Sequence, residues 1–258
     1  MFREKMTTPA IPERVYALCK IVEKRPISSR DLKERMEPSY LNQSSSYFGD
    51  YRAAAEELKL IVISDNVVSL AVASSTIHSI FDMRSHVNSM LEEFRMGQFY
   101  QITKAYFDMG SEVLSGNKNI AQWDDVFRNR FGIAVDQMAL RGWRFWATFL
   151  GFGYLQDMFF IPNADVFLRD LISRSGLERN EHYAVSAFVK ALCPQGNIVL
   201  SGAISEKRFN YGVSNGLRTL HDQGFLKMEH ILDFEDLWSL YPMKAHSISG
   251  TITHITIC

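Results

Sequence analysis

The sequence predicts a mainly helical fold with small β-hairpins, which places the chain in the α+β class. One observation behind this prediction is a pattern that occurs near each end: a helix with apolar residues three and four apart runs directly into an extended segment. The other is a long middle stretch of helical periodicity that is rich in tryptophan. We therefore expect three parts, residues 1–73, 74–175 and 176–258.

The composition favours a folded, cytoplasmic protein. With 258 residues and 47% hydrophobic content, the chain can bury a large core. The first ten residues carry charges and no apolar run, so we expect no signal peptide. The longest apolar stretch, residues 145–155, is too short to cross a bilayer, and no membrane contact is expected. Three widely spaced cysteines indicate neither a disulfide framework nor a zinc site.

The charge distribution opposes extensive phosphate contact. Proteins that hold nucleic acid through phosphates are usually basic, whereas the formal net charge here is −1. The first part has a formal charge of +1 and the other two −1 each. Any contact with DNA must therefore come from a local patch.

The first part is predicted to contain three helices and a hairpin. Pro9 and Pro12 precede a helix with one apolar stripe, and Pro26 ends it. Ser28 or Ser29 caps a short second helix. A third helix is expected over 45–59, and two β-branched runs on either side of the turn at 64–66 form a hairpin.

This arrangement resembles the winged-helix superfamily over the whole first part. In Leu58-Lys59-Leu60-Ile61, Lys59 stands where many members have glycine. The resemblance implies that the third helix enters the DNA major groove and that the hairpin, or wing, touches the backbone or minor groove. The residues that it makes candidates for DNA contact are Ser44, Ser45, Ser46, Tyr47 and Arg52. The wing tip, 64–66, has no basic residue.

The middle part is predicted to be an all-helical bundle, with breaks at Gly97, 115–118, Gly132 and Pro162. Its fourth helix, expected from 135 to 150 or beyond, is crowded with aromatic residues. These are Trp143, Trp146, Phe149, Phe152 and Tyr154. So dense a stripe indicates a core or a subunit interface more than a cofactor site.

The third part repeats the plan of the first. A helix is expected over 181–192 and a second candidate recognition helix over 211–223, followed by Gly224 where a helix end must turn left-handed. The wing is enlarged, with 225–231 pairing with 251–257. Basic and polar residues that make this part a candidate DNA surface are Lys207, Arg208, Asn210, Tyr211, Ser214, Asn215 and Arg218. Gly212 and Gly216 allow either close helix packing or approach to a nucleic-acid backbone.

We find no constellation that predicts catalysis, a metal or a cofactor. His221 and Asp222 form an isolated pair, and the chain has no phosphate-binding glycine motif. An enzymatic function would be supported only if His221, Asp222 and acidic residues of the middle part lay together in one pocket.

The layout is also similar to DpdG-type accessory proteins of bacterial DNA-modification islands, through Pro12-Glu13-Arg14-Val15 to Leu18 and the Trp-rich helix. That similarity implies a role in DNA modification or phage defence. We predict a non-enzymatic protein that binds double-stranded DNA, with the third part making the contact and the first docking a protein. The alternative is an adaptor that uses its winged helices to assemble a larger, ATPase-containing complex. A homodimer is compatible with either.

Overall fold

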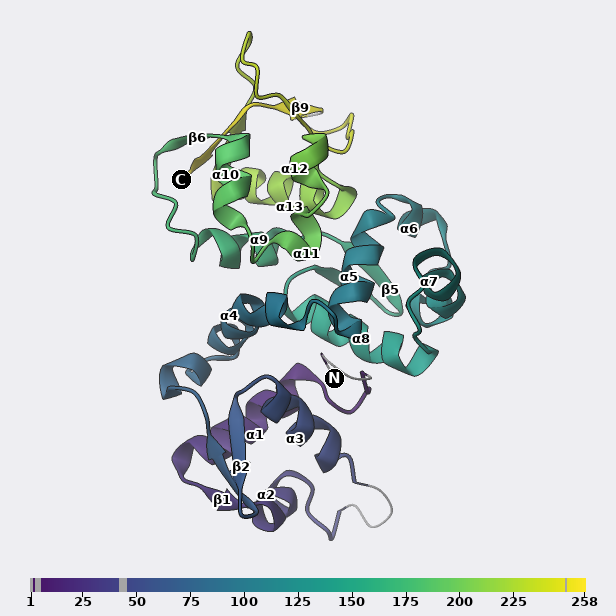
Figure 1. Ribbon diagram of the computed structural model, residues 1–258, viewed down its shortest axis with the longest axis vertical. Coiled ribbons are helices and arrows are strands. Elements are labelled where there is room, and N and C mark those ends of the chain that lie inside the picture. The colour runs from purple at the N-terminus through teal and green to yellow at the C-terminus, as the bar shows by residue number, and fades with distance from the viewer. Residues whose placement is uncertain (1, 3–5, 42–45, 249) are drawn as a thin grey trace.

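The computed structural model describes residue 2 and residues 6–41, 46–248 and 250–258. Helices dominate, and the strands described form small antiparallel sheets, so the α+β class is confirmed. The N-terminal part lies at the bottom of Figure 1 and the C-terminal part at the top, with the middle helices between them.

The N-terminal part contains the three helices and the hairpin that were predicted, and a short strand, β1 (Ile27–Ser28), that was not, so its sheet has three strands. They are α1 (Pro12–Lys24), β1 (Ile27–Ser28), α2 (Ser29–Met36), α3 (Phe48–Glu57), β2 (Ile61–Ser64) and β3 (Val67–Leu70), and the strand order is β1-β3-β2. The Ser28 side chain caps α2 by accepting a hydrogen bond from the Asp31 amide at 3.1 Å. Asp65 and Asn66 both have positive φ, which suits a two-residue turn between paired strands.

A similar order of elements recurs near the C-terminus. It comprises α9 (Asp165–Ile172), β6 (His182–Ala184), α10 (Val185–Leu192), α11 (Asn197–Leu200), α12 (Ala203–Glu206), α13 (Tyr211–Asp222), β7 (Leu226–Glu229) and β10 (His254–Ile257). The strand order β6-β10-β7 again places the last strand between the other two. The insert between β7 and β10 contains β8 (Trp238–Ser239) and β9 (Thr251–Ile252).

Two expectations for this region have different outcomes. The predicted pairing across the enlarged wing is confirmed, with Glu229 opposite His254. The helix predicted over 181–192 is wrong at its start, because His182 pairs with Thr256 in the sheet and the helix begins only at Val185.

The two candidate recognition helices end in the same way. Lys59 and Gly224 have φ values of 54° and 67°, and the residue after each donates its amide to a carbonyl five residues back. These hydrogen bonds are Leu60 N to Ala55 O at 3.0 Å and Phe225 N to Leu220 O at 2.9 Å. The left-handed turn predicted at Gly224 is confirmed, and Lys59 adopts the same conformation without being glycine.

We expect opposite responses when the residue types at these two turns are changed. Gly224→Ala should lower the free energy of unfolding by about 1 kcal/mol, because a side chain in the left-handed region is strained. Lys59→Gly should leave it unchanged or raise it by about 0.5 kcal/mol, since its exposed pair with Glu93 contributes little. Urea titrations measure both. Gly202→Ala is the control, because Gly202 has φ −85° and open space around its Cβ position. Equal losses at residues 59 and 224 would contradict this account.

The middle part is not all-helical, which corrects the prediction. The helices α4 (Ile80–Met90), α5 (Gln98–Asp108), α6 (Glu112–Ser115), α7 (Asp124–Phe131) and α8 (Gln137–Phe149) are followed by a hairpin of β4 (Gly153–Gln156) and β5 (Phe159–Pro162). Gly151, with φ 87°, ends the helical run. Phe160 is then buried in the core, where its carbonyl accepts a hydrogen bond from the Tyr106 hydroxyl at 2.7 Å.

The two tryptophans of α8 lie in a core within one chain, whereas Tyr154 of the predicted stripe lies in β4 and is exposed. Trp143 and Trp146 are fully buried. The Trp143 indole donates to the Thr103 hydroxyl at 2.9 Å, and the Trp146 indole donates to the Ala10 carbonyl at 2.6 Å. Phe2 packs edge-on against Trp146, with ring centroids 5.1 Å apart. Of the two alternatives for this stripe, a core and a subunit interface, the structure supports the core.

Trp146→Ala should therefore lower the free energy of unfolding by about 3–5 kcal/mol, because it leaves a cavity and an unpaired carbonyl at Ala10. Arg141→Ala, an exposed change on the same helix, should stay within about 0.5 kcal/mol of the wild type. Chemical unfolding together with sedimentation tests this. A Trp146→Ala protein that stays folded but loses mass would identify a subunit interface instead.

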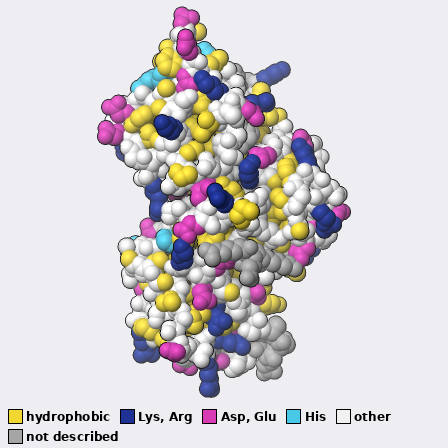
Figure 2. All heavy atoms as spheres, viewed as in Figure 1, with side chains coloured by type: hydrophobic (Ala, Val, Ile, Leu, Met, Phe, Trp, Pro, Cys, Tyr) yellow, Lys and Arg dark blue, Asp and Glu magenta, His cyan; other side chains and the backbone are white. Residues whose placement is uncertain are grey.

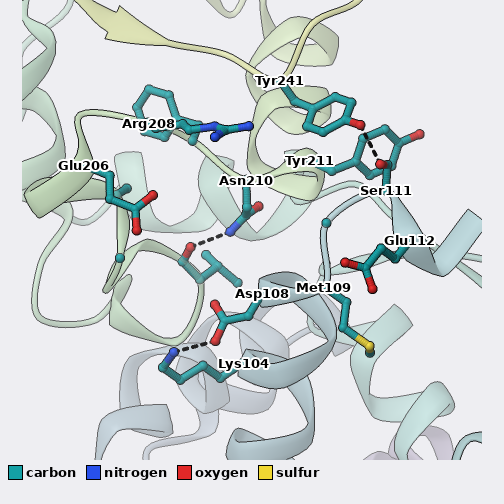
Figure 3. Close-up of a pocket in the computed structure, with 15 residues that line it drawn as sticks. Lys104, Asp108, Met109, Ser111, Glu112, Glu206, Arg208, Asn210, Tyr211 and Tyr241 are labelled. Carbon is teal, nitrogen blue, oxygen red and sulfur yellow. Dashed lines mark hydrogen bonds and ion pairs between the residues drawn. The ribbon is translucent and has the colours of Figure 1, made fainter. Parts of the chain in front are cut away.

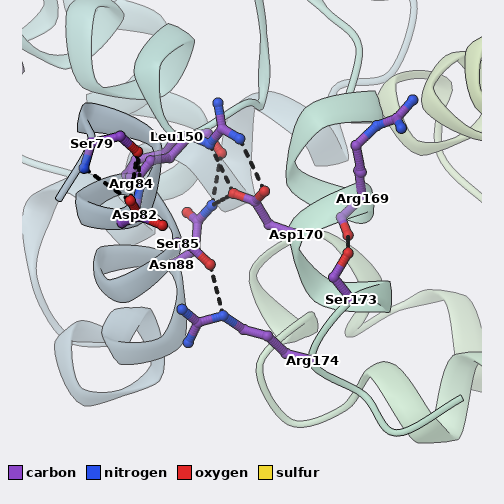
Figure 4. Close-up of polar contacts among 10 residues, drawn as sticks. All are labelled: Ser79, Asp82, Arg84, Ser85, Asn88, Leu150, Arg169, Asp170, Ser173 and Arg174. Carbon is purple, nitrogen blue, oxygen red and sulfur yellow. Dashed lines mark hydrogen bonds and ion pairs between the residues drawn. The ribbon is translucent and has the colours of Figure 1, made fainter. Parts of the chain in front are cut away.

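A buried polar cluster joins α4 to α9 (Figure 4). Arg84 contacts both oxygens of the Asp170 carboxylate, at 2.8 and 3.0 Å. The Asn88 amide donates to the same carboxylate at 3.0 Å and to the Leu150 carbonyl at 3.1 Å. Because α9 also packs on α13, the cluster fixes the C-terminal sheet and helices to the middle helices.

Candidate functional site

Helix α13, the candidate recognition helix of the C-terminal part, is mostly buried. Arg218 near its centre is only 3% exposed, so the predicted phosphate contact is wrong for this residue. Its guanidinium donates to the Ile248 carbonyl at 3.0 Å and to the Tyr241 carbonyl at 2.8 Å. Burial lowers the pKa of this guanidinium. Arg218 therefore holds the insert between β7 and β10 against the helix.

Ser214 and Asn215 are also directed into the protein and away from any surface that DNA could contact. Ser214 is fully buried, and its hydroxyl accepts a hydrogen bond from the Tyr241 amide at 2.8 Å. The half-buried Asn215 points its amide at the Pro162 carbonyl, 3.4 Å away. Both side chains contact other residues of the chain, whereas DNA binding would require them to lie on a free surface.

The glycines of α13 serve close packing, not a nucleic-acid backbone. A Cβ on Gly216 would lie 2.8 Å from the backbone of Ala164 and Asp165, and one on Gly212 would lie 2.4 Å from the Phe107 ring. The Gly212 carbonyl also accepts a hydrogen bond from the Ala164 amide at 3.0 Å. This face of the helix is occupied by the chain itself.

Lys207 is exposed but paired. Its ammonium lies 3.0 Å from the Asp236 carboxylate. Asp236 also accepts hydrogen bonds from the amide and hydroxyl of Ser186, at 2.9 and 2.6 Å, and from the Trp238 indole at 3.1 Å. Burial alone would raise the pKa of Asp236, but these hydrogen bonds outweigh it and lower that pKa to about 2.

The remaining C-terminal candidates meet in a cavity of about 590 Å³ between the middle and C-terminal parts (Figure 3). Arg208, Asn210 and Tyr211 lie on one side of it, and residues from the end of α5 and the start of α6 lie on the other. The further polar residues lining it are Lys104, Asp108, Ser111, Glu112, Glu206 and Tyr241. Three of the residues that the sequence made candidates for DNA contact, Arg208, Asn210 and Tyr211, thus line one recess between two parts of the chain.

Most polar groups in this cavity already have partners. Asn210 caps α13 by accepting from the Val213 amide at 2.9 Å, and its own amide donates to the Val199 carbonyl at 2.9 Å. Lys104 pairs with Asp108 at 2.7 Å. Arg208 and Glu206 have no ion pair among the described residues. Such mixed charge suits a small polar ligand or a protein side chain better than a phosphate backbone.

At the N-terminal candidate site, the Glu37 carboxylate accepts the hydrogen bonds that a bound anion could otherwise accept. It accepts hydrogen bonds from the Ser46 hydroxyl at 2.8 Å, the Tyr47 amide at 3.1 Å and the Tyr51 hydroxyl at 3.1 Å. Desolvation and this carboxylate together raise the pKa of Tyr51. Sequence reasoning missed Glu37, because it lies in a connecting segment, ten residues before Tyr47, whose amide it accepts a hydrogen bond from. Ser44 and Ser45 lie outside the described residues.

The exposed face of α3 has no lysine or arginine that could contact DNA phosphates. Its exposed residues are Gly49, Ala53 and Glu56. Arg52 is half-buried, where its guanidinium donates to the Ser29 hydroxyl at 2.8 Å and lies over the Phe48 ring. Among the described candidates, Arg52 is thus engaged within the chain, whereas Ser46 and Tyr47 are exposed and contact Glu37.

The residues considered for catalysis are used in local contacts. His221 accepts a hydrogen bond from the Met228 amide at 3.2 Å, and Asp222 lies 3.0 Å from the His246 ring. Neither residue lines the cavity of Figure 3. Within the described part of the chain, no three His, Cys, Asp or Glu residues are placed to hold a metal ion.

No family model matches this chain, and no curated protein or solved structure matches it either. Among the described helices, none has the length and apolar character needed to span a bilayer. The functional argument therefore depends on the geometry of this chain.

The Asp236 cluster predicts a stability difference that depends on pH. Because the folded-state pKa is depressed, the carboxylate stabilises the fold above pH 4, and this stabilisation is lost as the pH falls from about 4 to 2. Asp236→Asn should cost about 1–2 kcal/mol of unfolding free energy at pH 7 and much less at pH 2.5. Urea titrations at both pH values measure this. Asp233→Asn, at an exposed neighbour, is the control. A deficit for Asp236→Asn that is equal at both pH values would refute this explanation.

Proposed function

We propose that this protein is a non-enzymatic adaptor in which two winged-helix units bind protein partners. The order of helices and the strand orders β1-β3-β2 and β6-β10-β7 support the winged-helix assignment of both units. The observation that carries the adaptor role is the burial of α13, the helix that would have to read DNA in the C-terminal unit.

To enter a major groove, α13 would have to leave its present neighbours. Its glycine face contacts the segment after β5, and Arg218 holds the wing insert. Separation would leave Arg218 and the polar groups around it without their partners, at a cost of several kcal/mol. A partner protein can instead bind the surfaces that are already exposed.

The N-terminal unit supports the same proposal. The Glu37 carboxylate occupies the start of α3, where a phosphate would otherwise approach free amide groups. A second negative charge at this place would be repelled. Glu56 on the exposed face and Asp65 at the wing tip add to this repulsion.

DNA binding is the second candidate function, and one observation favours it. Lys24, Arg25, Arg30, Lys33 and Arg35 are exposed at the end of α1 and on α2, and none has an ion pair in the described part of the chain. Contact through this surface would place DNA on the N-terminal unit, the reverse of the asymmetry that we expected. The similarity to accessory proteins of DNA-modification islands suggests phage defence as the setting for either function, and the neighbouring genes would test it.

The adaptor proposal predicts that a tagged full-length chain, recovered from its own host, retains a stoichiometric protein partner after nuclease treatment. The quadruple variant Lys24→Ala/Arg25→Ala/Arg30→Ala/Lys33→Ala should retain that partner equally well, because the interaction does not depend on phosphate. Quantitative mass spectrometry of the recovered complexes measures both.

The DNA candidate predicts a different outcome. Partners would be released by nuclease, and the purified chain would bind duplex DNA with a steep salt dependence. The quadruple variant would then reduce the log–log slope by about one for each phosphate that the protein no longer binds. This combination of results would replace the adaptor proposal.

A further inference from the structure

The segment 230–237, between β7 and β8, forms a projecting finger on the C-terminal unit. It is the part of the wing insert that extends beyond the sheet at the top of Figure 1. Its apolar side chains are exposed by 41% to 78% of their area, with Leu232 the most exposed. They are Ile231, Leu232, Phe234 and Leu237. Large apolar side chains rarely gather so closely on a surface unless another molecule covers them.

The base of the finger is firmly held. The Ile231 amide donates to the Thr253 hydroxyl at 2.9 Å, and Phe234 packs edge-on against His254 with centroids 4.4 Å apart. On the other side, Asp236 is bound by Ser186 and Lys207, and the buried Trp238 packs on Phe209. Both ends of the finger are therefore fixed to the unit, which reduces the backbone entropy lost when a partner binds.

Carboxylates alternate with the apolar residues of the finger. Asp233 and Glu235 are exposed and have no ion pair in the described part of the chain. Figure 2 shows acidic side chains at the tip and hydrophobic side chains just below it. Covering these carboxylates without a cation would leave unpaired charges in an apolar contact, which is costly. The occupant of this surface must therefore supply positive charge.

We infer that the finger is a docking element for a protein whose groove has an apolar floor and a rim of lysine or arginine. This inference rests on the proposed adaptor function and names the surface and the chemistry of its partner. Leu232 and Phe234 fill the floor of the groove, and Asp233 and Glu235 pair with its rim. Nucleic acid and anionic membranes do not fit, because both would face the finger with like charge.

The test uses the full-length chain in its own host, with the photo-crosslinking residue p-benzoylphenylalanine at position 232. Met96, which is 84% exposed and lies on the middle part, is the control position. We expect an adduct with one protein from position 232 and not from position 96, with the crosslink in a peptide that contains lysine or arginine. Asp233→Lys/Glu235→Lys in the same background should reduce the adduct at least tenfold.

A matched charge reversal, Glu178→Lys/Glu181→Lys, changes two exposed acids of the same part and should leave the adduct unchanged. Melting temperatures establish that all variants are folded. The inference is overturned if position 232 gives no adduct beyond that at position 96, gives one only with a second copy, or gives one that tolerates charge reversal at 233 and 235. If the protein complex recovered after nuclease treatment is still present when one of these results is obtained, the finger is not the docking site but the adaptor proposal stands. If no such complex exists, the adaptor function itself fails.

Discussion

The close approach of α13 to the segment after β5 is the constraint on which the rest of the C-terminal half depends. Two glycines make it feasible, because a Cβ at Gly216 would collide with the backbone at Ala164. Another face of the helix is covered by the insert between β7 and β10, where the Ile248 and Tyr241 carbonyls accept hydrogen bonds from Arg218. A helix that is used in this way contributes to the core and has little surface left for recognition.

The two similar units have thus been adapted in different ways. In the N-terminal unit the third helix keeps an exposed face, but an internal carboxylate occupies its start. In the C-terminal unit the helix is buried and the insert between β7 and β10 carries the exposed apolar surface. The two units therefore share a strand order but differ in the side chains and loops that they expose, which is where function resides in a fold.

Sequence reasoning succeeded where local rules decide the structure. The Ser28 cap, the turn at Asp65 and Asn66 and the left-handed turn at Gly224 depend on residues close in the chain. It failed where distant contacts decide. His182 joins a strand because β10 lies beside it, and the hairpin after Gly151 is fixed by packing of Phe160 against α5 and α8. The burial of Arg218 could not be predicted for the same reason, since its partners Tyr241 and Ile248 lie more than 20 residues away in the sequence.

The Asp236 cluster has a mechanical consequence for the cavity of Figure 3. Lys207 is bound to Asp236 through its side chain, and its carbonyl accepts a hydrogen bond from the Ser239 amide at 2.9 Å. The next residue, Arg208, lines the cavity, and Phe209 donates its amide to the Ser239 carbonyl at 2.9 Å. The base of the finger and one wall of the cavity therefore share a single short ladder of bonds. A displacement at the base of the finger would strain the hydrogen bonds of Lys207 and Phe209, on either side of the cavity residue Arg208.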